Sequence, residues 1–215
     1  MPSAIHNAFL DASLLVCALA VALWMQPWRW LRGGALLTPV LATLVVLPWL
    51  WALPQLHAMP LQLQFSGACM VTLMLGWPLA VLLLLAVAVI AGLLSGAPAL
   101  DSIVALALWQ GVLPATLALC LGALLRRITG EHLFVYVLGR AFLGTAVCLF
   151  ASSALAQWLG QPLPGVGGDL SMVAHWLMAW GDAFMTGMLT AVFVAFKPEW
   201  LATWSDRLYL RPPPA

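Results

Sequence analysis

The stretch LAVLLLLAVAVIAGLLS, residues 79–95, contains no charged side chain and decides the fold class. A helix that crosses the hydrocarbon core of a bilayer needs about 20 mostly apolar residues. Shorter apolar runs occur inside soluble proteins, but here similar runs lie on both sides of this one, separated by turn residues. The pattern predicts an all-α protein that crosses a membrane several times.

The composition agrees with this prediction. Of the 215 residues, 64% are hydrophobic and 7% are charged, whereas soluble domains carry about 25% charged residues. The net charge of +1 excludes a basic nucleic-acid-binding protein and an acidic disordered chain. So much apolar surface cannot be hidden inside a soluble globule of this size, which argues against a soluble enzyme. The four cysteines lie in apolar runs without a CxxC spacing, as buried thiols do.

The whole chain, 1–215, is expected to form one transmembrane domain, with a short cytoplasmic tail from about residue 197. The first apolar run is about as long as a spanning helix and no Lys or Arg precedes it, so we expect it to be retained and not cleaved as a signal peptide. Six spans are the alternative to seven, because the third is short enough to be broken or re-entrant. The seven candidate spans are 8–26, 35–54, 62–77, 79–95, 102–125, 132–159 and 170–196.

The basic residues predict the orientation. With the N-terminus outside and the C-terminus inside, seven of the eight Lys and Arg residues fall on the cytoplasmic side, and the eighth, Arg140, lies within the sixth span. Cytoplasmic loops of membrane proteins carry this excess of basic residues. The outer segments are then expected to carry the acidic residues Asp11, Asp101 and Asp169.

Two charged residues are predicted inside spans, where charges are costly and often functional. Asp182 would lie about 20 Å from the cytoplasmic end of the last span, and Arg140 about 12 Å from that side. Asp182 either bonds to a neighbouring helix as a structural carboxylate or supports a transport pathway. Arg140 either extends to the cytoplasmic interface or serves as polar support within the membrane. We expect Asp182→Ala to impair folding or transport more than Asp169→Ala.

Three histidines, His6, His57 and His175, are predicted near the outer face, whereas His132 lies at the inner edge. Neutral imidazoles that converge can bind a transition metal ion. The alternative is that His6 and His57 are ordinary solvated residues of irregular segments. The sequence has no Walker A sequence, no HExxH and no Rossmann glycine pattern, so no catalytic motif supports an enzymatic function.

The C-terminal stretch AHWLMAWGDAFMTGMLTA, residues 174–191, resembles the last helix of the CbiM/NikM family. These proteins are the substrate-specific permease subunits of energy-coupling factor (ECF) ABC transporters for cobalt and nickel. His175 and Asp182 follow the spacing of the family's histidine and acidic residue, with Asp in place of Glu. Further segments of the chain resemble a divergent proteobacterial branch of the family. They are FSG 65–67, VTL 71–73, WPLA 77–80, LFVY 133–136, FKPEWL 196–201 and DRLYL 206–210.

The metal ligands of that family are only partly present. The resemblance implies a site made by the N-terminal amine, a histidine at the second position and a later histidine. Here the second residue is Pro2, the nearest histidine is His6, and the later position corresponds to Gln64. Proline cannot supply the backbone nitrogen that a square-planar site needs. The fold and the transport role are thus better supported than the metal.

The resemblance implies a multi-pass protein of the bacterial cytoplasmic (inner) membrane that takes up cobalt or nickel ions. It would have no permanently bound cofactor, and its partners would be cytoplasmic ABC ATPase subunits and a second transmembrane coupling subunit. ATP hydrolysis would belong to those partners, so the chain itself would not be an enzyme. The alternative function is a membrane scaffold or assembly protein on the same fold that does not bind metal.

Overall fold

The computed structural model describes residues 2–31, 33–56, 65–96, 99–130, 132–159 and 168–205, and within these ranges the regular structure is entirely helical. Five helices are long and apolar enough to cross a membrane. The prediction of an all-α polytopic membrane protein is therefore confirmed. Their apolar windows are Leu37–Pro54, Trp77–Leu94, Leu100–Thr129, Val135–Trp158 and Leu170–Phe196.

These windows belong to helices that agree with five of the predicted spans. They are α3 (Leu37–Leu56), α5 (Trp77–Leu94), a continuous helix of α6 (Leu100–Ala105), η1 (Leu106–Val112) and α7 (Leu113–Thr129), a second continuous helix of η2 (Val135–Leu143) and α8 (Gly144–Trp158), and α9 (Gly168–Phe196). The segments η1 and η2 are π-helical turns within their longer helices. The first predicted span is α1 (Pro2–Trp24), which begins earlier than the sequence suggested. Two short helices, α2 (Trp28–Leu31) and η3 (Pro198–Trp200), complete the set.

The third predicted span, 62–77, is not a spanning helix. Its described part contains α4 (Ala68–Leu75), whose eight residues extend only about 12 Å. A glycine with positive φ stands at each end, Gly67 at 64° and Gly76 at 75°. L-residues rarely adopt such angles, so each glycine interrupts the helix, and Pro78 then favours a new start as α5 begins. The third span, which the sequence allowed to be broken, is thus a half-length helix, α4.

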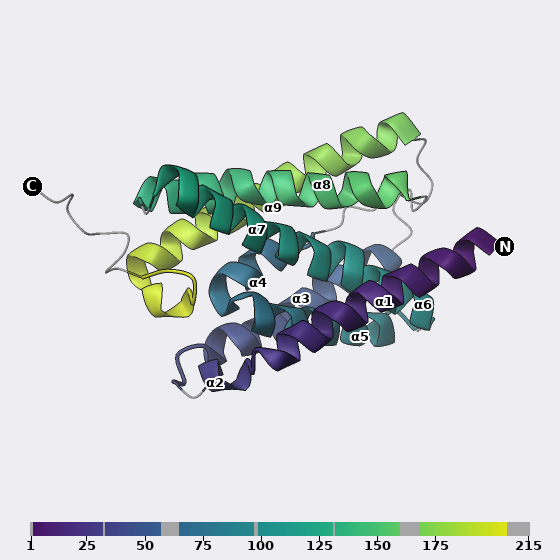
Figure 1. The fold of residues 1–215 in the computed structure, drawn as a ribbon, viewed down its shortest axis with the longest axis horizontal. Helices are drawn as coiled ribbons and strands as arrows, with labels where there is room; N and C mark the ends of the chain where they lie inside the picture. Colours follow the sequence, from purple (N-terminus) through teal and green to yellow (C-terminus); the bar gives the residue numbers. More distant parts are fainter. Residues whose placement is uncertain are drawn as a thin grey trace, which may run out of the picture.

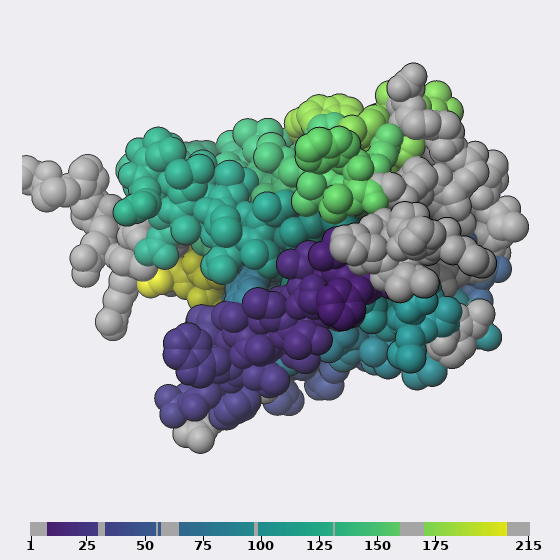
Figure 2. All heavy atoms as spheres, turned by 45° about the vertical axis from the view of Figure 1, so that its right-hand side comes forward, coloured from purple at the N-terminus to yellow at the C-terminus, as the bar shows by residue number. Residues whose placement is uncertain are grey.

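This half-length helix lies at the centre of the bundle (Figure 1). All eight residues of α4 are buried, and α4 contacts α3, α5, α7, α9 and both π-helical segments. Around it, α1 and α3 pack on α5, while α8 packs between α7 and α9. In the space-filling view α1 lies along the surface (Figure 2). Its side chains Phe9 and Trp24 are exposed, as expected for a helix that faces lipid.

The two ends of the bundle differ in charge. One end, in Figure 1, contains the short helix α2, the end of α7 and the end of α9. These segments carry or adjoin Arg29, Arg126, Arg127 and Lys197. The other end contains α6, with Asp101. The start of α1 and the end of α9 are also at opposite ends, as an odd number of crossings requires. This arrangement agrees with the predicted clustering of basic residues, while the N-out orientation stays a prediction.

Candidate functional site

Asp182 lies in the middle of α9 and is 3% exposed. Its Oδ2 accepts a hydrogen bond from the backbone N–H of Ser66 at 2.7 Å, and its Oδ1 accepts one from the N–H of Gly67 at 3.2 Å. These N–H groups belong to the two residues just before α4, beside the helix end that has unpaired donors and a partial positive charge. Asp182 therefore caps a helix that begins inside the bundle. Of the two roles considered for Asp182, this geometry supports that of a structural carboxylate.

The short segment before α4 is also held by two further elements, α3 and η1. The indole Nε1 of Trp51 in α3 donates to the carbonyl of Ser66 at 3.0 Å. The Ser66 hydroxyl donates to the carbonyl of Gln110 in η1 at 2.6 Å and accepts from the N–H of Ala68 at 3.2 Å. The Gln110 amide, in turn, donates to the carbonyl of Phe65 at 3.2 Å. Irregular backbone at membrane depth is tolerated where protein covers it and bonds its polar groups, as here.

The π-helical form of η1 explains why its backbone can accept these bonds. A π-bulge shifts the helical hydrogen-bond register and commonly marks a functional position in a helix. Two carbonyls of η1 accept hydroxyls from outside its own long helix, Gln110 from Ser66 and Trp109 from Ser152 of α8 at 2.9 Å. The bulge thus bonds on one side to the segment 65–67 before α4, which we call the α4 entry, and on the other side to α8.

The far end of α4 is capped by the segment that follows α9. The backbone N–H of Ala202 donates to the Met74 carbonyl at 2.9 Å, and that of Thr203 donates to the Leu73 carbonyl at 3.3 Å. The Thr203 hydroxyl also donates to the Leu73 carbonyl at 2.8 Å and lies 2.7 Å from the hydroxyl of Tyr136. The start of the predicted cytoplasmic tail is therefore packed against the bundle. One helix, α9, and its continuation hold α4 at both ends.

A polar face runs along α9 toward the interior of the bundle. Thr186 and Thr190 follow Asp182 at intervals of one turn and are buried, and the Thr190 hydroxyl lies 3.6 Å from the Met70 sulfur, to which it donates. The hydroxyl of Thr186 is buried without a hydrogen-bond partner in the described part of the chain. Ser171 and His175 continue the same face toward the start of α9. Polar side chains of membrane helices usually face the interior of the bundle, as these do.

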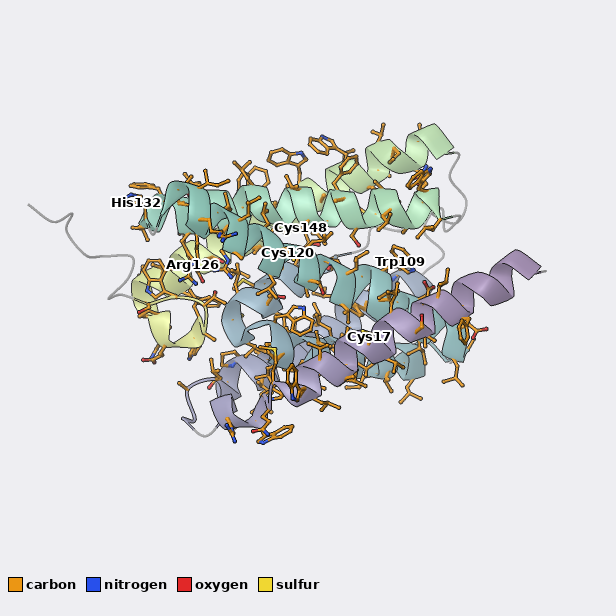
Figure 3. All side chains as sticks on the ribbon, in the orientation of Figure 1. Cys17, Trp109, Cys120, Arg126, His132 and Cys148 are labelled. Atoms are coloured by element: carbon orange, nitrogen blue, oxygen red, sulfur yellow. The ribbon has the colours of Figure 1, made fainter. Side chains whose placement is uncertain are left out.

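The region near the start of α9 contains further polar groups. An edge-to-face contact between the rings of Phe150 and Trp176, with centroids 5.1 Å apart, brings the middle of α8 beside this part of α9. Ser152 of α8 bonds to the Trp109 carbonyl, and the buried indole Nε1 of Trp109 has no hydrogen-bond partner among the described residues (Figure 3). The buried hydroxyl of Ser171 is likewise without one. Buried polar atoms that lack partners are uncommon and often belong to binding sites.

The proposed histidine site is only partly described. His175 is half-buried on α9, with its Nδ1 shielded from solvent close to the backbone of Ser171. His6 lies in α1, but its side chain, together with the whole of His57 and Gln64, falls outside the described residues. Within the described ranges, no three His, Cys, Asp or Glu side chains form a group able to hold a metal ion. Convergence of the three histidines therefore stays a prediction. His132, at the opposite end of the molecule, is exposed (Figure 3).

Arg140 does not join Asp182. It lies in η2, with its guanidinium against Gly122 of α7 and its Cζ 5.7 Å from the centre of the Tyr136 ring. In the described chain, the partners of Asp182 are the backbone N–H groups at the α4 start. The two charges predicted to be polar support within the membrane thus act at separate places.

Sequence reasoning missed two residues that hold the segment before α4. Gln110 and Trp51 hold the α4 entry, although an uncharged glutamine within an apolar run was a signal for Gln110. Asp11 was expected in an outer segment, but it lies within α1 and is 5% exposed. Because α1 begins at Pro2, Asp11 lies about two and a half turns inside the helix, and its place on the outer side stays a prediction. No family model, curated protein or solved structure matches the chain.

Proposed function

We propose that the chain is a substrate-binding membrane subunit of an uptake transporter. The observation that carries the proposal is α4, a half-length helix that begins inside the bundle at a network formed by Asp182, Ser66 and Gln110. Transporter sites near the middle of the bilayer are typically built from such interrupted helices. A helix that only anchors a protein in lipid needs neither an interruption nor a buried network.

The resemblance to the CbiM/NikM family supplies the finer proposal. The chain would be the substrate-specific subunit of an ECF-type ABC transporter in a bacterial inner membrane and would import cobalt or nickel ions. Cytoplasmic ABC ATPases and a second transmembrane subunit would supply the energy. His175 and Asp182 lie on one face of α9, two turns apart, which supports their correspondence to the family's pattern. His175 is the strongest candidate ligand, followed by His6 and then His57.

A scaffold or assembly protein on the same fold is the second candidate. It is favoured by the hydrogen bonds of Asp182, because both carboxylate oxygens are already engaged in holding α4. A carboxylate used in this way stabilises the bundle whether or not a substrate binds. The replacement of the family's ligands by Pro2 and Gln64 points in the same direction.

Calorimetric titration of nickel, cobalt and copper ions into the purified protein separates the two candidates. The transporter proposal requires binding clearly tighter than about 1 mM, which corresponds to about 4 kcal/mol. It also requires loss of binding in His175→Ala, while His132→Ala, at the other end of the molecule, should bind as the wild type does. Absence of binding, or equal binding by both variants, would leave the scaffold role.

A second measurement tests the energy coupling without depending on the metal. The tagged full-length chain is purified from membranes of its native host in a mild detergent, and the proteins bound to it are identified by mass spectrometry. Co-purification of an ABC ATPase together with a second membrane protein is the expected result. Recovery of the chain with neither would contradict the ECF assignment, whatever the titrations gave.

A further inference from the structure

The guanidinium of Arg140 lies in a notch that only a glycine leaves open. Arg140 belongs to η2, and its head group lies against Gly122 of α7. A Cβ atom at position 122 would be 2.6 Å from Nε and 2.8 Å from Cζ of Arg140, closer than real Cβ contacts allow. Any larger residue at position 122 would therefore push the guanidinium out of its present place.

This guanidinium lacks a counter-charge in the described part of the protein. Its Nε is buried and has no hydrogen-bond partner there, and the nearest aromatic group is the Tyr136 ring at 5.7 Å. Neither α7 nor η2 contains an acidic residue, and Glu199 at the same end of the molecule pairs with Lys197 at 3.3 Å. An arginine within a membrane helix normally pairs with an acidic group or with backbone carbonyls. The cation–π contact alone compensates for little of its desolvation.

The surroundings of the notch favour an anionic lipid as the missing partner. Gly122 is seven residues from the end of α7, or about 10 Å, which is within reach of the polar headgroup region for a long side chain. Arg126 follows Gly122 by one turn and is a second basic residue on that helix face. It lies toward the same end of the molecule as His132 (Figure 3). On other faces of the same two helices, Leu124 and Leu138 are exposed apolar residues, as in helices whose outer sides face acyl chains.

We propose that Arg140, seated at Gly122, binds the phosphate group of an anionic phospholipid in the leaflet at the basic end of the bundle. A planar guanidinium matches phosphate oxygens with two parallel hydrogen bonds. Basic pockets between transmembrane helices are known places for anionic headgroups. The site is independent of the proposed transport function, because it lies away from Asp182 and α4.

The test uses the purified full-length chain in detergent and native mass spectrometry with added lipids. Phosphatidylglycerol and phosphatidylcholine of the same acyl chains are titrated into the wild type, Arg140→Gln and Arg127→Gln. Arg127 is the matched control, since it is an exposed arginine of the same helix end that does not lie on the Gly122 face. We expect the wild type to prefer phosphatidylglycerol, Arg140→Gln to bind it about tenfold more weakly, or about 1.4 kcal/mol, and Arg127→Gln to match the wild type.

Gly122→Ala provides a variant that keeps every charge. It should displace the guanidinium and weaken phosphatidylglycerol binding, and a helical circular dichroism spectrum confirms that each variant folds. Equal binding by Arg140→Gln and Arg127→Gln would overturn the proposal, as would wild-type binding without preference between the two lipids. Inorganic phosphate that competes with micromolar affinity would identify a free anion and overturn the lipid assignment. An absence of any lipid preference would point instead to an acidic side chain of a partner subunit.

Discussion

At the scale of single residues, Asp182 solves a problem created by starting a helix inside a membrane protein. The first N–H groups of α4 have no carbonyl one turn earlier and no water to bond. The carboxylate accepts from the N–H groups of Ser66 and Gly67, the two residues just before the helix, and its charge lies at the positive end of the helix dipole. Asp182 is thus placed by α9 but acts on α4, which makes the position of α4 depend on that of α9.

Asp182→Ala should lower the free energy of unfolding by about 2–4 kcal/mol, because two buried N–H groups lose their acceptors at about 1–3 kcal/mol each. Unfolding of the purified protein in mixed detergent micelles measures the change. Asp101→Ala is the control, since Asp101 is an exposed acidic residue at the start of α6. Similar small losses in the two variants would contradict the capping role of Asp182.

Gly67→Ala should also destabilise the protein. Its φ of 64° costs an L-residue about 1–2 kcal/mol, and the new Cβ would lie 2.8 Å from Cδ1 of Leu47. Gly181→Ala in α9 is the opposite case, because no atom lies within 4 Å of a Cβ there and alanine favours a helix by about 1 kcal/mol. The same unfolding measurement should separate the two variants in sign. A stabilised Gly67→Ala would show that the turn before α4 tolerates an ordinary residue.

At the scale of elements, the sequence predicts the long helices well and the short one poorly. Apolar runs such as 79–95 become helices because a membrane leaves the backbone no other way to satisfy its hydrogen bonds. The span 62–77 also has no charged residue but contains two Gln, a Ser, a Thr and two Gly, and it yields an eight-residue helix. Gly76 and Pro78 indicated the break. The partners of the break, Trp51, Gln110 and Asp182, lie far from it along the chain, so hydropathy could not pair them with it.

Thr203→Val tests the hydrogen bonds between the segment after α9 and the C-terminal end of α4. The variant removes the hydroxyl that donates to Leu73 and lies next to the Tyr136 hydroxyl, while keeping the shape of the side chain. Hydrogen-exchange mass spectrometry should show faster exchange of the α4 amides, with a loss of about 1 kcal/mol in stability. Thr129→Val is the control, since the Thr129 hydroxyl bonds to Leu125 within its own helix. Unchanged protection of α4 would mean that the segment after α9 only lies beside it.

At the scale of the whole molecule, the site is less predictable than the fold. Composition and apolar runs are properties of the chain, so they were sufficient for the membrane assignment. Asp182 and Arg140 were recognised because charge is rare in spans, but their partners turned out to be backbone N–H groups and a glycine notch. Neither partner has a sequence signature of its own. The histidine site depends on His6 and His57, whose side chains lie outside the described residues, and it awaits the titration.

The orientation of the bundle in its membrane is the last prediction. Arg29, Arg126 and Lys197 lie toward one end, and because basic residues are retained in the cytoplasm, that end should face inward. Arg29→Cys and Asp101→Cys are introduced separately into a chain whose four cysteines, of which Cys17 and Cys120 are exposed, have been replaced by alanine. An impermeant maleimide applied to intact cells should label position 101 at once and position 29 only after permeabilisation. Labelling of position 29 from outside would invert the topology, and the start of α9, with His175, could then no longer be the entrance for a substrate taken up into the cell.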